Sequence, residues 1–154
     1  MVLLPEARHS GSGRTVRTMS MTTTARPTSR ESLDRLVRCS SQDAGTARWW
    51  TCLSQSLDDL HLELVSGDVE GLAAQVIEDA PELGAAATRL PTLDARARAE
   101  LAELRALVGQ HYGVPAMVAE IRAATQALLR RVRTLYRLSD DLLLDAYERD
   151  FGGE

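Results

Sequence analysis

The amino-acid sequence predicts an all-α protein: an antiparallel helical hairpin or four-helix bundle with a long C-terminal helix and a disordered N-terminal arm. Apolar residues recur every three or four positions from Trp49 onward, which is the spacing of one face of an α-helix. No segment shows the alternation of apolar and polar residues that is typical of a strand. Alanine and leucine are abundant and aromatic residues make up 4%, a balance that favours helix over sheet.

The chain divides into an arm and one domain. Residues 1–44 contain glycines and three consecutive threonines without a sustained period, so we expect a disordered basic arm there, apart from a short helix over 32–38. Residues 45–154 are expected to form the helical bundle domain, and 44% hydrophobic content is enough for a modest core. Met19 and Met21 are alternative starts, so the sequence leaves open whether residues 1–20 are translated.

The first two expected helices are separated by the cluster SGDVEG, residues 66–71. It is not a phosphate loop, because the chain has no lysine, and it lacks the ligand spacing of an EF-hand. We expect a joint in which Gly67 takes the left-handed conformation and Asp68 caps the next helix, so that the second helix folds back on the first. The stripe before the joint contains Trp49 or Trp50, Leu53, Leu57, Leu60 and Leu64.

Prolines mark the next boundaries. Pro81 is expected to kink or restart the second helix, and Pro91 to end it, with Thr92 or Asp94 capping the third. Gly113 is expected to end the third helix and Pro115 to open the fourth. The second stripe contains Val69, Leu72, Val76, Leu83, Ala87 and Leu90, and the third contains Leu93, Ala97, Leu101, Leu104 and Val108.

The fourth expected helix is the longest and has a coiled-coil-like pattern. Near its end, three consecutive leucines (142–144) cover more than one face, and Tyr147 adds an aromatic side chain. This surplus fits a protein partner or a homodimer, although packing onto the helix at 32–38 or over the bundle end would also account for it. The stripe contains Val118, Ile121, Thr125, Leu128, Val132, Leu135, Leu138 and Leu142.

Charge and cysteine content limit the function. Residues 49–154 hold ten arginines against eighteen acids, which argues against a nucleic-acid binder. No apolar run reaches the roughly 20 residues that span a bilayer. Two isolated cysteines, Cys39 and Cys52, fit reduced thiols and a cytoplasmic protein.

The sequence contains no complete catalytic or metal-binding constellation. Asp58-x-x-His61 with Glu63 resembles part of a di-iron site, but the second acid-x-x-His pair is missing, since Val108 precedes His111 by three residues. Three scattered histidines support no triad. We therefore expect no enzyme activity, no catalytic residue, no metal and no cofactor.

Four arginines interrupt the acidic body on the fourth helix: Arg130, Arg131, Arg133 and Arg137. They lie off the apolar stripe, so they form either a solvated face or a site for an anionic partner. The sequence leaves this alternative open.

Two segments resemble flagellar export chaperones of the FlgN or FliT type: GDVEGLAAQVIEDAPELGAAATRL (67–90) and LLLDAYERDFGG (142–153). The resemblance covers residues 46–153 and rests on leucine periodicity and one turn; Pro81 and the paired tryptophans depart from the family pattern. It implies a cytosolic, non-enzymatic chaperone that holds a helical segment of a filament or hook-associated subunit.

The sequence therefore favours a non-enzymatic chaperone or adaptor whose C-terminal helix binds a partner's amphipathic helix. The alternative is a small regulatory protein, of anti-sigma or partner-switch type, that sequesters a transcription component. Neither reading names the partner or the oligomeric state. The residues predicted to contact the partner are Leu128, Val132, Leu135, Leu138, Leu142 and Tyr147.

Overall fold

The structure, a computed structural model, describes residues 30–151, with side chains through residue 148. Within that range the chain is helical and contains no strand, so the prediction of an all-α fold with a long C-terminal helix is confirmed. Residues 1–29 of the disordered arm predicted for residues 1–44 lie outside the described residues. The elements are α1 (Glu31–Ser40), α2 (Ala47–Ser66), α3 (Val69–Asp79), the 3-10 helix η1 (Pro81–Leu83), α4 (Gly84–Ala87), α5 (Arg89–Gln110), the 3-10 helix η2 (Pro115–Met117) and α6 (Val118–Phe151).

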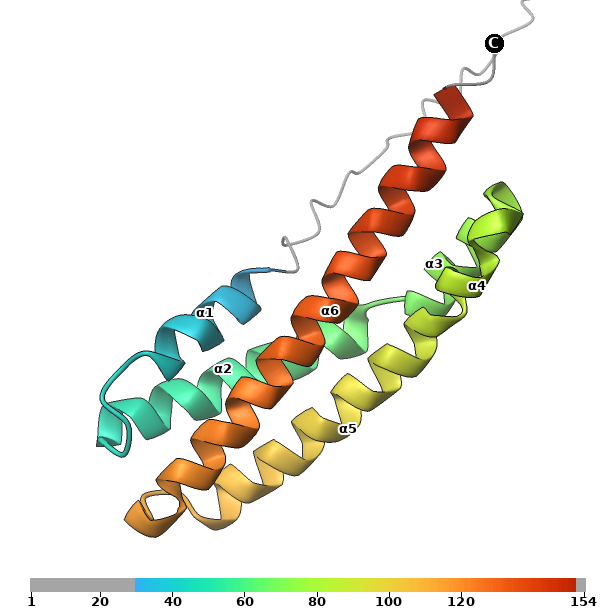
Figure 1. Ribbon diagram of the computed structural model, residues 1–154. Helices are drawn as coiled ribbons and strands as arrows, with labels where there is room; N and C mark the ends of the chain where they lie inside the picture. The colour runs from blue at the N-terminus through green and yellow to red at the C-terminus, as the bar shows by residue number, and fades with distance from the viewer. Residues whose placement is uncertain (1–29, 152–154) are drawn as a thin grey trace, which may run out of the picture.

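Two antiparallel hairpins form the body of the molecule (Figure 1). The first joins α1 to α2, the second joins α5 to α6, and the hairpins pack together through α2 on α5 and α1 on α6. α3 packs against α5 and against the C-terminal half of α6, beyond the end of α2. The arrangement leaves α3 and the end of α6 on either side of an open flank.

The apolar stripes predicted from the sequence meet in one continuous core. Trp49 and Trp50 anchor its lower end, where both are buried and their ring centroids lie 4.9 Å apart in an edge-to-face arrangement. Tyr112 covers Trp50 from the α5–α6 turn, at 5.5 Å between centroids. Two adjacent tryptophans can both be buried because they lie at the end of the bundle, where neighbouring faces of α2 are both covered.

The boundary expected at residue 44 is wrong for residues 30–44. α1 buries Leu33, Leu36 and Cys39 in the core and packs along α2. An isolated helix of ten residues is only marginally stable in water, so the stability of α1 depends on the α2 surface that it covers. The folded body therefore begins at α1.

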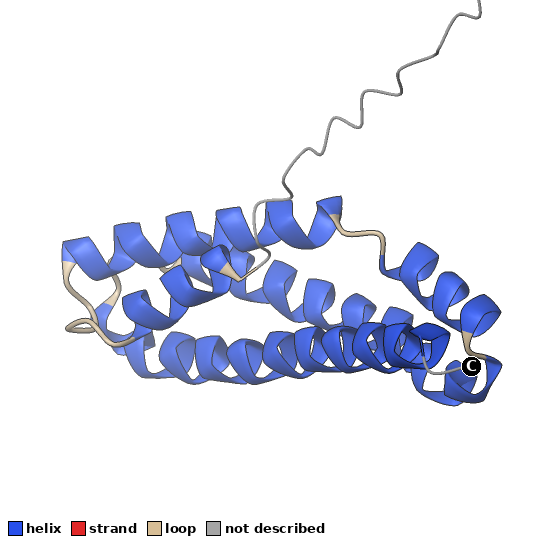
Figure 2. Ribbon diagram, turned by 90° about the horizontal axis from the view of Figure 1, so that it is seen from above, coloured by secondary structure: helices blue, strands red, loops and turns tan. Residues whose placement is uncertain are grey.

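The joint at residues 67–68 differs from the expectation in one respect and matches it in another. Gly67 is extended, with φ −75° and ψ 136°, and is not left-handed. Asp68 caps α3 as predicted, since its Oδ1 accepts a hydrogen bond from the Gly71 amide at 2.8 Å. Because an extended joint does not reverse the chain, α3 continues away from α2 and does not fold back on it (Figure 2).

The prolines act mainly as helix starters. α3 ends at Asp79 and Pro81 opens η1, which agrees with the predicted restart. Pro91 does not end a helix, because it lies in the first turn of α5, where no intrahelical donor is needed. Because α5 begins at Arg89, Thr92 and Asp94 lie inside the helix and do not cap it. Gly113, with φ 79°, follows α5 as expected.

Candidate functional site

The structure buries most of the residues predicted to contact a partner. Tyr147 is 61% exposed, and Leu138 is partly buried against the core. The other four point into the bundle, so they stabilise the fold and offer no surface in this conformation: Leu128, Val132, Leu135 and Leu142. Their periodicity marks the face of α6 that packs inside the molecule.

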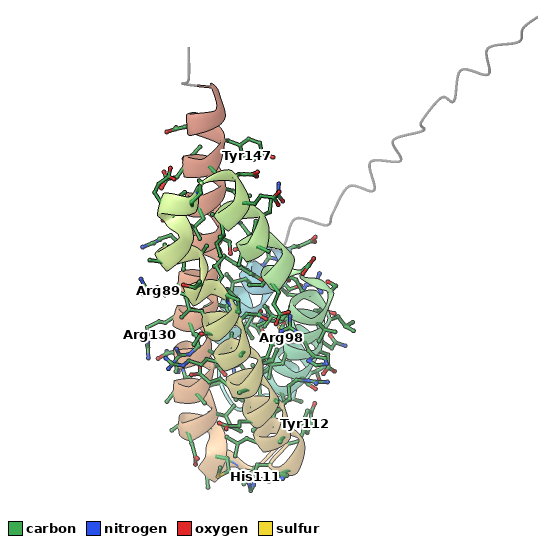
Figure 3. All side chains as sticks on the ribbon, turned by 90° about the vertical axis from the view of Figure 1, so that its right-hand side faces the viewer. Arg89, Arg98, His111, Tyr112, Arg130 and Tyr147 are labelled. Carbon is green, nitrogen blue, oxygen red and sulfur yellow. The ribbon has the colours of Figure 1, made fainter. Side chains whose placement is uncertain are left out.

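A groove of about 1160 Å³ lies on the open flank between α3 and the C-terminal half of α6, and we call it the α3–α6 groove. The start of α1 and the end of α2 complete its walls. Tyr147 stands at its upper end, far from Tyr112 and His111 at the opposite end of the molecule (Figure 3). The lining residues are Arg30, Glu31, Ser32, Arg35, Asp59, Leu62, Glu63, Leu64, Ser66, Gly67, Asp68, Val69, Gly71, Leu72, Gln75, Asp94, Leu135, Tyr136, Ser139, Asp140, Leu143 and Tyr147.

The walls of the groove carry apolar side chains that the core leaves uncovered. Leu62 on α2 is 66% exposed and Tyr147 on α6 is 61% exposed. Leu72 on α3 and Leu143 on α6 are half-buried beside them. Apolar side chains on opposite walls of one groove are an arrangement that suits an amphipathic helix.

The groove is acidic. Six carboxylates and two arginines line it. Both arginines are already paired, because Arg30 forms an ion pair with Asp140 across to α6, and Arg35 forms one with Asp59 on α2. Arg35 also lies 3.9 Å from Oε1 of Glu31, measured from its Nη2. The other three carboxylates, Glu63, Asp68 and Asp94, have no partner among the arginines of the lining.

Glu63 lies on the groove floor, where its Oε1 accepts a hydrogen bond from the Tyr136 hydroxyl at 2.9 Å. Burial raises the pKa of Glu63 above its usual value, although hydrogen bonds from Ser32 and Tyr136 oppose the rise. Burial, and then the adjacent Glu63 carboxylate, raise the pKa of Tyr136, so this hydroxyl stays a donor at neutral pH.

Asp94 approaches the same floor from α5 and is only 7% exposed. Its Oδ2 lies 2.7 Å from Nε of Arg98, one turn along the helix (Figure 3 labels Arg98). Burial raises the pKa of Asp94, with Arg98 acting in the opposite direction. Its Oδ1 has no hydrogen-bond partner among the described residues.

The structure separates the residues considered for a metal site. Asp58 pairs with Arg105, whose Nη2 lies 2.7 Å from Oδ1, while Glu63 faces Tyr136 in the groove. Within residues 30–148, no three acid, histidine or cysteine side chains converge as metal ligands would. The carboxylates of the groove take part in hydrogen bonds and ion pairs.

The arginine cluster of α6 is mostly free of partners. Arg131 is partly buried and its Nε lies 2.5 Å from Oε1 of Glu100. Arg130, Arg133 and Arg137 are exposed and take part in none of the ion pairs that the structure shows between residues 30 and 148. Figure 3 shows Arg130 projecting on the same side of the molecule as Arg89 of α5.

Both cysteines are free thiols at the α1–α2 contact. Cys39 is fully buried, and burial, together with Cys52 nearby, raises its pKa to about 12. Cys52 is half-buried and lines a shallow pocket of about 430 Å³ on α2. A buried thiol with a high pKa is a poor nucleophile, and Cys39 is such a thiol.

Sequence reasoning missed the groove because its walls come from four helices whose mutual arrangement the periodicity does not encode. One signal was available. Asp94 continues the spacing of Leu90, Ala97 and Leu101, which places a carboxylate on the buried face of α5. A charged residue in phase with an apolar stripe indicates either a buried ion pair or a binding site.

None of the described helices is long and apolar enough to cross a membrane. When the chain is compared with protein-family models, with curated proteins and with solved structures, none of the three comparisons finds a match.

Proposed function

We propose that this protein is a non-enzymatic helical adaptor or chaperone that holds an amphipathic helical segment of a partner protein in the α3–α6 groove. The observation that carries the proposal is the groove itself, with exposed apolar side chains on its walls and polar groups on its floor. An α-helix with its side chains is about 10–12 Å across and rises 1.5 Å per residue, so about two turns would fill a volume of 1160 Å³.

The proposal moves the binding surface from the buried stripe of α6 to the groove beside it. Leu62 and Tyr147 would contact the apolar face of the partner helix from opposite walls. Large exposed side chains that cost little to immobilise, tyrosine in particular, are frequent anchors of such contacts. α6 keeps its role, because the half that carries Tyr147 forms one wall.

The resemblance of residues 46–153 to flagellar export chaperones suggests one setting for this activity. In that setting the bound segment would belong to a filament or hook-associated subunit, and the groove would shield its apolar face before assembly.

Site-specific photo-crosslinking tests the proposal. A benzophenone amino acid is placed at position 62 or 147 in the groove, or at one of two control positions that are exposed on the same helices but lie outside the groove lining. The controls are Val65 on α2, 54% exposed, and Leu144 on α6, 58% exposed. The protein is irradiated in an extract of cells that produce it.

We expect one partner to crosslink at positions 62 and 147, within one predicted amphipathic helix of that partner, and not at 65 and 144. Equal labelling from all four positions, or labelling from the controls alone, would rule out the groove as the binding surface.

The second candidate function, a regulatory protein that sequesters an acidic partner, is favoured by one observation. Arg130, Arg133 and Arg137 are exposed on one side of α6 without ion-pair partners among the described residues. If this face binds the partner, reversing these three charges should abolish capture while Arg38→Glu, which reverses an exposed arginine on α1, should leave it intact. The groove proposal expects the opposite: capture survives the triple charge reversal.

A further inference from the structure

We propose that the floor of the α3–α6 groove is a recognition site for a lysine or arginine side chain, held between Glu63 and Asp94, and that the partner segment is therefore a basic amphipathic helix. The inference rests on the proposed function and names the chemical class of its ligand. In the α3–α6 groove, apolar walls occur together with two carboxylates, Glu63 and Asp94, that no arginine of the lining pairs with.

The unpaired oxygen of Asp94 is the first observation. The residue is 93% buried, since its exposed fraction is 7%, and its Oδ1 has no hydrogen-bond partner among residues 30–148. A buried carboxylate oxygen without a donor has lost its hydrogen bonds to water and gained none in return, which destabilises the folded state. A donor supplied from the groove would remove that cost, and a charged donor would also offset the desolvation that raises the pKa of Asp94.

Glu63 supplies the second set of acceptors. The Tyr136 hydroxyl donates to Oε1 of Glu63, and Ser32 also donates to this carboxylate. A carboxylate has about four acceptor positions, so Glu63 can accept further hydrogen bonds. Glu63, Asp94 and Tyr136 line the same groove, and the charges of both carboxylates help to raise the pKa of Tyr136. Two acceptor groups on one floor match the several N–H donors of a guanidinium or an ammonium group.

The charge of the whole groove is the third observation. Six carboxylates face two arginines, and both arginines are held by Asp140 and Asp59. Arg98 pairs with one oxygen of Asp94, and the Tyr136 hydroxyl donates to Glu63. A neutral or acidic helix in this groove would remove water from both carboxylates and bring no positive charge in exchange, which is unfavourable. A helix with lysine or arginine along one edge and aliphatic residues on one face would pair with the carboxylates of the floor and cover the apolar side chains of the walls.

A displayed helix library identifies the class of the ligand. Each 18-residue member has a fixed leucine and alanine face, and its other positions are randomised over Lys, Arg, Glu, Asp, Gln and Ser. The library is selected on the full-length protein, and selected members are tested against Leu62→Ala and Tyr147→Ala and against the matched controls Val65→Ala and Leu144→Ala.

We expect the selected helices to carry net positive charge and to bind more weakly to the two groove variants alone. Selected helices that depend on the groove but are neutral or acidic would overturn the basic ligand and leave the proposed function standing. If the selection yields no binder, or only binders whose affinity is unchanged by Leu62→Ala and Tyr147→Ala, both the proposed function and the basic ligand would be contradicted.

Titration of one selected peptide by fluorescence anisotropy then tests the floor. Asp94→Asn and Glu63→Gln should each weaken binding at least about tenfold, since each removes one charge from a buried ion pair. Glu103→Gln, which changes an exposed carboxylate on α5 outside the groove, should leave the affinity unchanged. Circular dichroism shows whether each variant is folded. If Asp94→Asn does not fold, the affinity of Glu63→Gln alone tests the proposed binding site.

Two further titrations address other occupants. A peptide of residues 1–29 that displaces the selected helix at a lower concentration than the helix itself would assign the groove to this chain's own arm. A concentration-dependent dimer that is lost in Leu62→Ala and Tyr147→Ala would assign it to a second copy. Either result would overturn the inference. The inference is supported if the peptide of residues 1–29 leaves the anisotropy of the bound helix unchanged and the protein is a monomer at all concentrations.

Discussion

Two carboxyl groups of the folded body, Glu63 and Asp94, lie in surroundings that disfavour their charged form. Burial is the main cause at both residues, and it raises the pKa of each above the value in an unfolded chain. The folded state therefore binds protons more tightly than the unfolded state at these positions. Because stability falls with pH wherever the folded state binds more protons, the two residues destabilise the fold at neutral pH.

Glu63→Gln tests this cost. The substitution removes the charge but keeps a side-chain oxygen that can accept from the Tyr136 hydroxyl. We expect the variant to be more stable than the wild type at pH 7, and the difference to vanish below about pH 4, where the wild-type carboxyl is protonated. Urea denaturation at pH 7 and below about pH 4 measures the difference in the free energy of unfolding between the two proteins. Glu103→Gln serves as the control, and an identical pH profile for wild type and Glu63→Gln would show that Glu63 is not desolvated.

The two thiols should differ sharply in reactivity. Cys39 is fully buried with a pKa near 12, whereas Cys52 is half-buried on α2. We expect iodoacetamide at pH 8 to alkylate Cys52 at least about tenfold faster than Cys39, because thiolate is the reacting species and Cys39 is both protonated and inaccessible. Mass spectrometry of peptides over time measures both rates. Comparable rates would mean that α1 separates readily from α2.

At the scale of the elements, the start of α3 is controlled by a contact between two residues. Asp68 caps the helix through the Gly71 amide, and a Cβ at Gly71 would collide with the Asp68 carboxylate. Glycine is therefore required at position 71 only as long as the cap is present.

A double-mutant cycle checks this dependence. Asp68→Ala should cost about 1 kcal/mol through loss of the cap. Gly71→Ala should also destabilise the wild type, because the new Cβ displaces the carboxylate, but should stabilise the Asp68→Ala protein by up to about 1 kcal/mol through helix propensity. Urea denaturation of the four proteins gives the coupling, and strictly additive effects would contradict the predicted collision.

The elements that sequence could predict are those that local periodicity and capping define. The stripe of α2, the long stripe of α6 and the Asp68 cap needed only neighbours in the chain. Pro91 was assigned to a helix end because proline is tolerated both after a helix and within its first turn, and the sequence does not distinguish these. Gly67 was expected to be left-handed because glycine permits that conformation, but it does not require it.

At the scale of the whole molecule, one continuous core joins both hairpins and α3. Since α1, α2, α5 and α6 each bury residues in it, no part of the described body has a core of its own. We expect one cooperative unfolding transition, in which tryptophan fluorescence from Trp49 and Trp50 and helical circular dichroism have the same urea midpoint. Separate midpoints would indicate that the α3 end unfolds independently of the tryptophan end.

The groove is a property of the assembled molecule, and this is why the sequence did not reveal it. Periodicity identified the apolar face of α6, but an apolar face that packs inside a protein looks the same in sequence as one that binds a partner. Leu128 and Val132 lie on the face of α6 that packs inside the protein. Leu143 and Tyr147 lie on the edge of α6 that lines the groove. The packing of α1, α3 and α5 on α6 determines which part of α6 stays accessible, and the path of α3 follows from an extended joint.

That extended joint has an evolutionary consequence. Gly67 and Asp68 connect two helices that do not pack on each other, so the length of the joint is not constrained by core packing between them. A descendant that gained one or two residues there could lengthen the wall of the groove between α2 and α3 while α3 kept its contacts with α5 and α6. The joint is thus the position at which this fold could acquire a ligand of another size by insertion, without a single substitution in its interior.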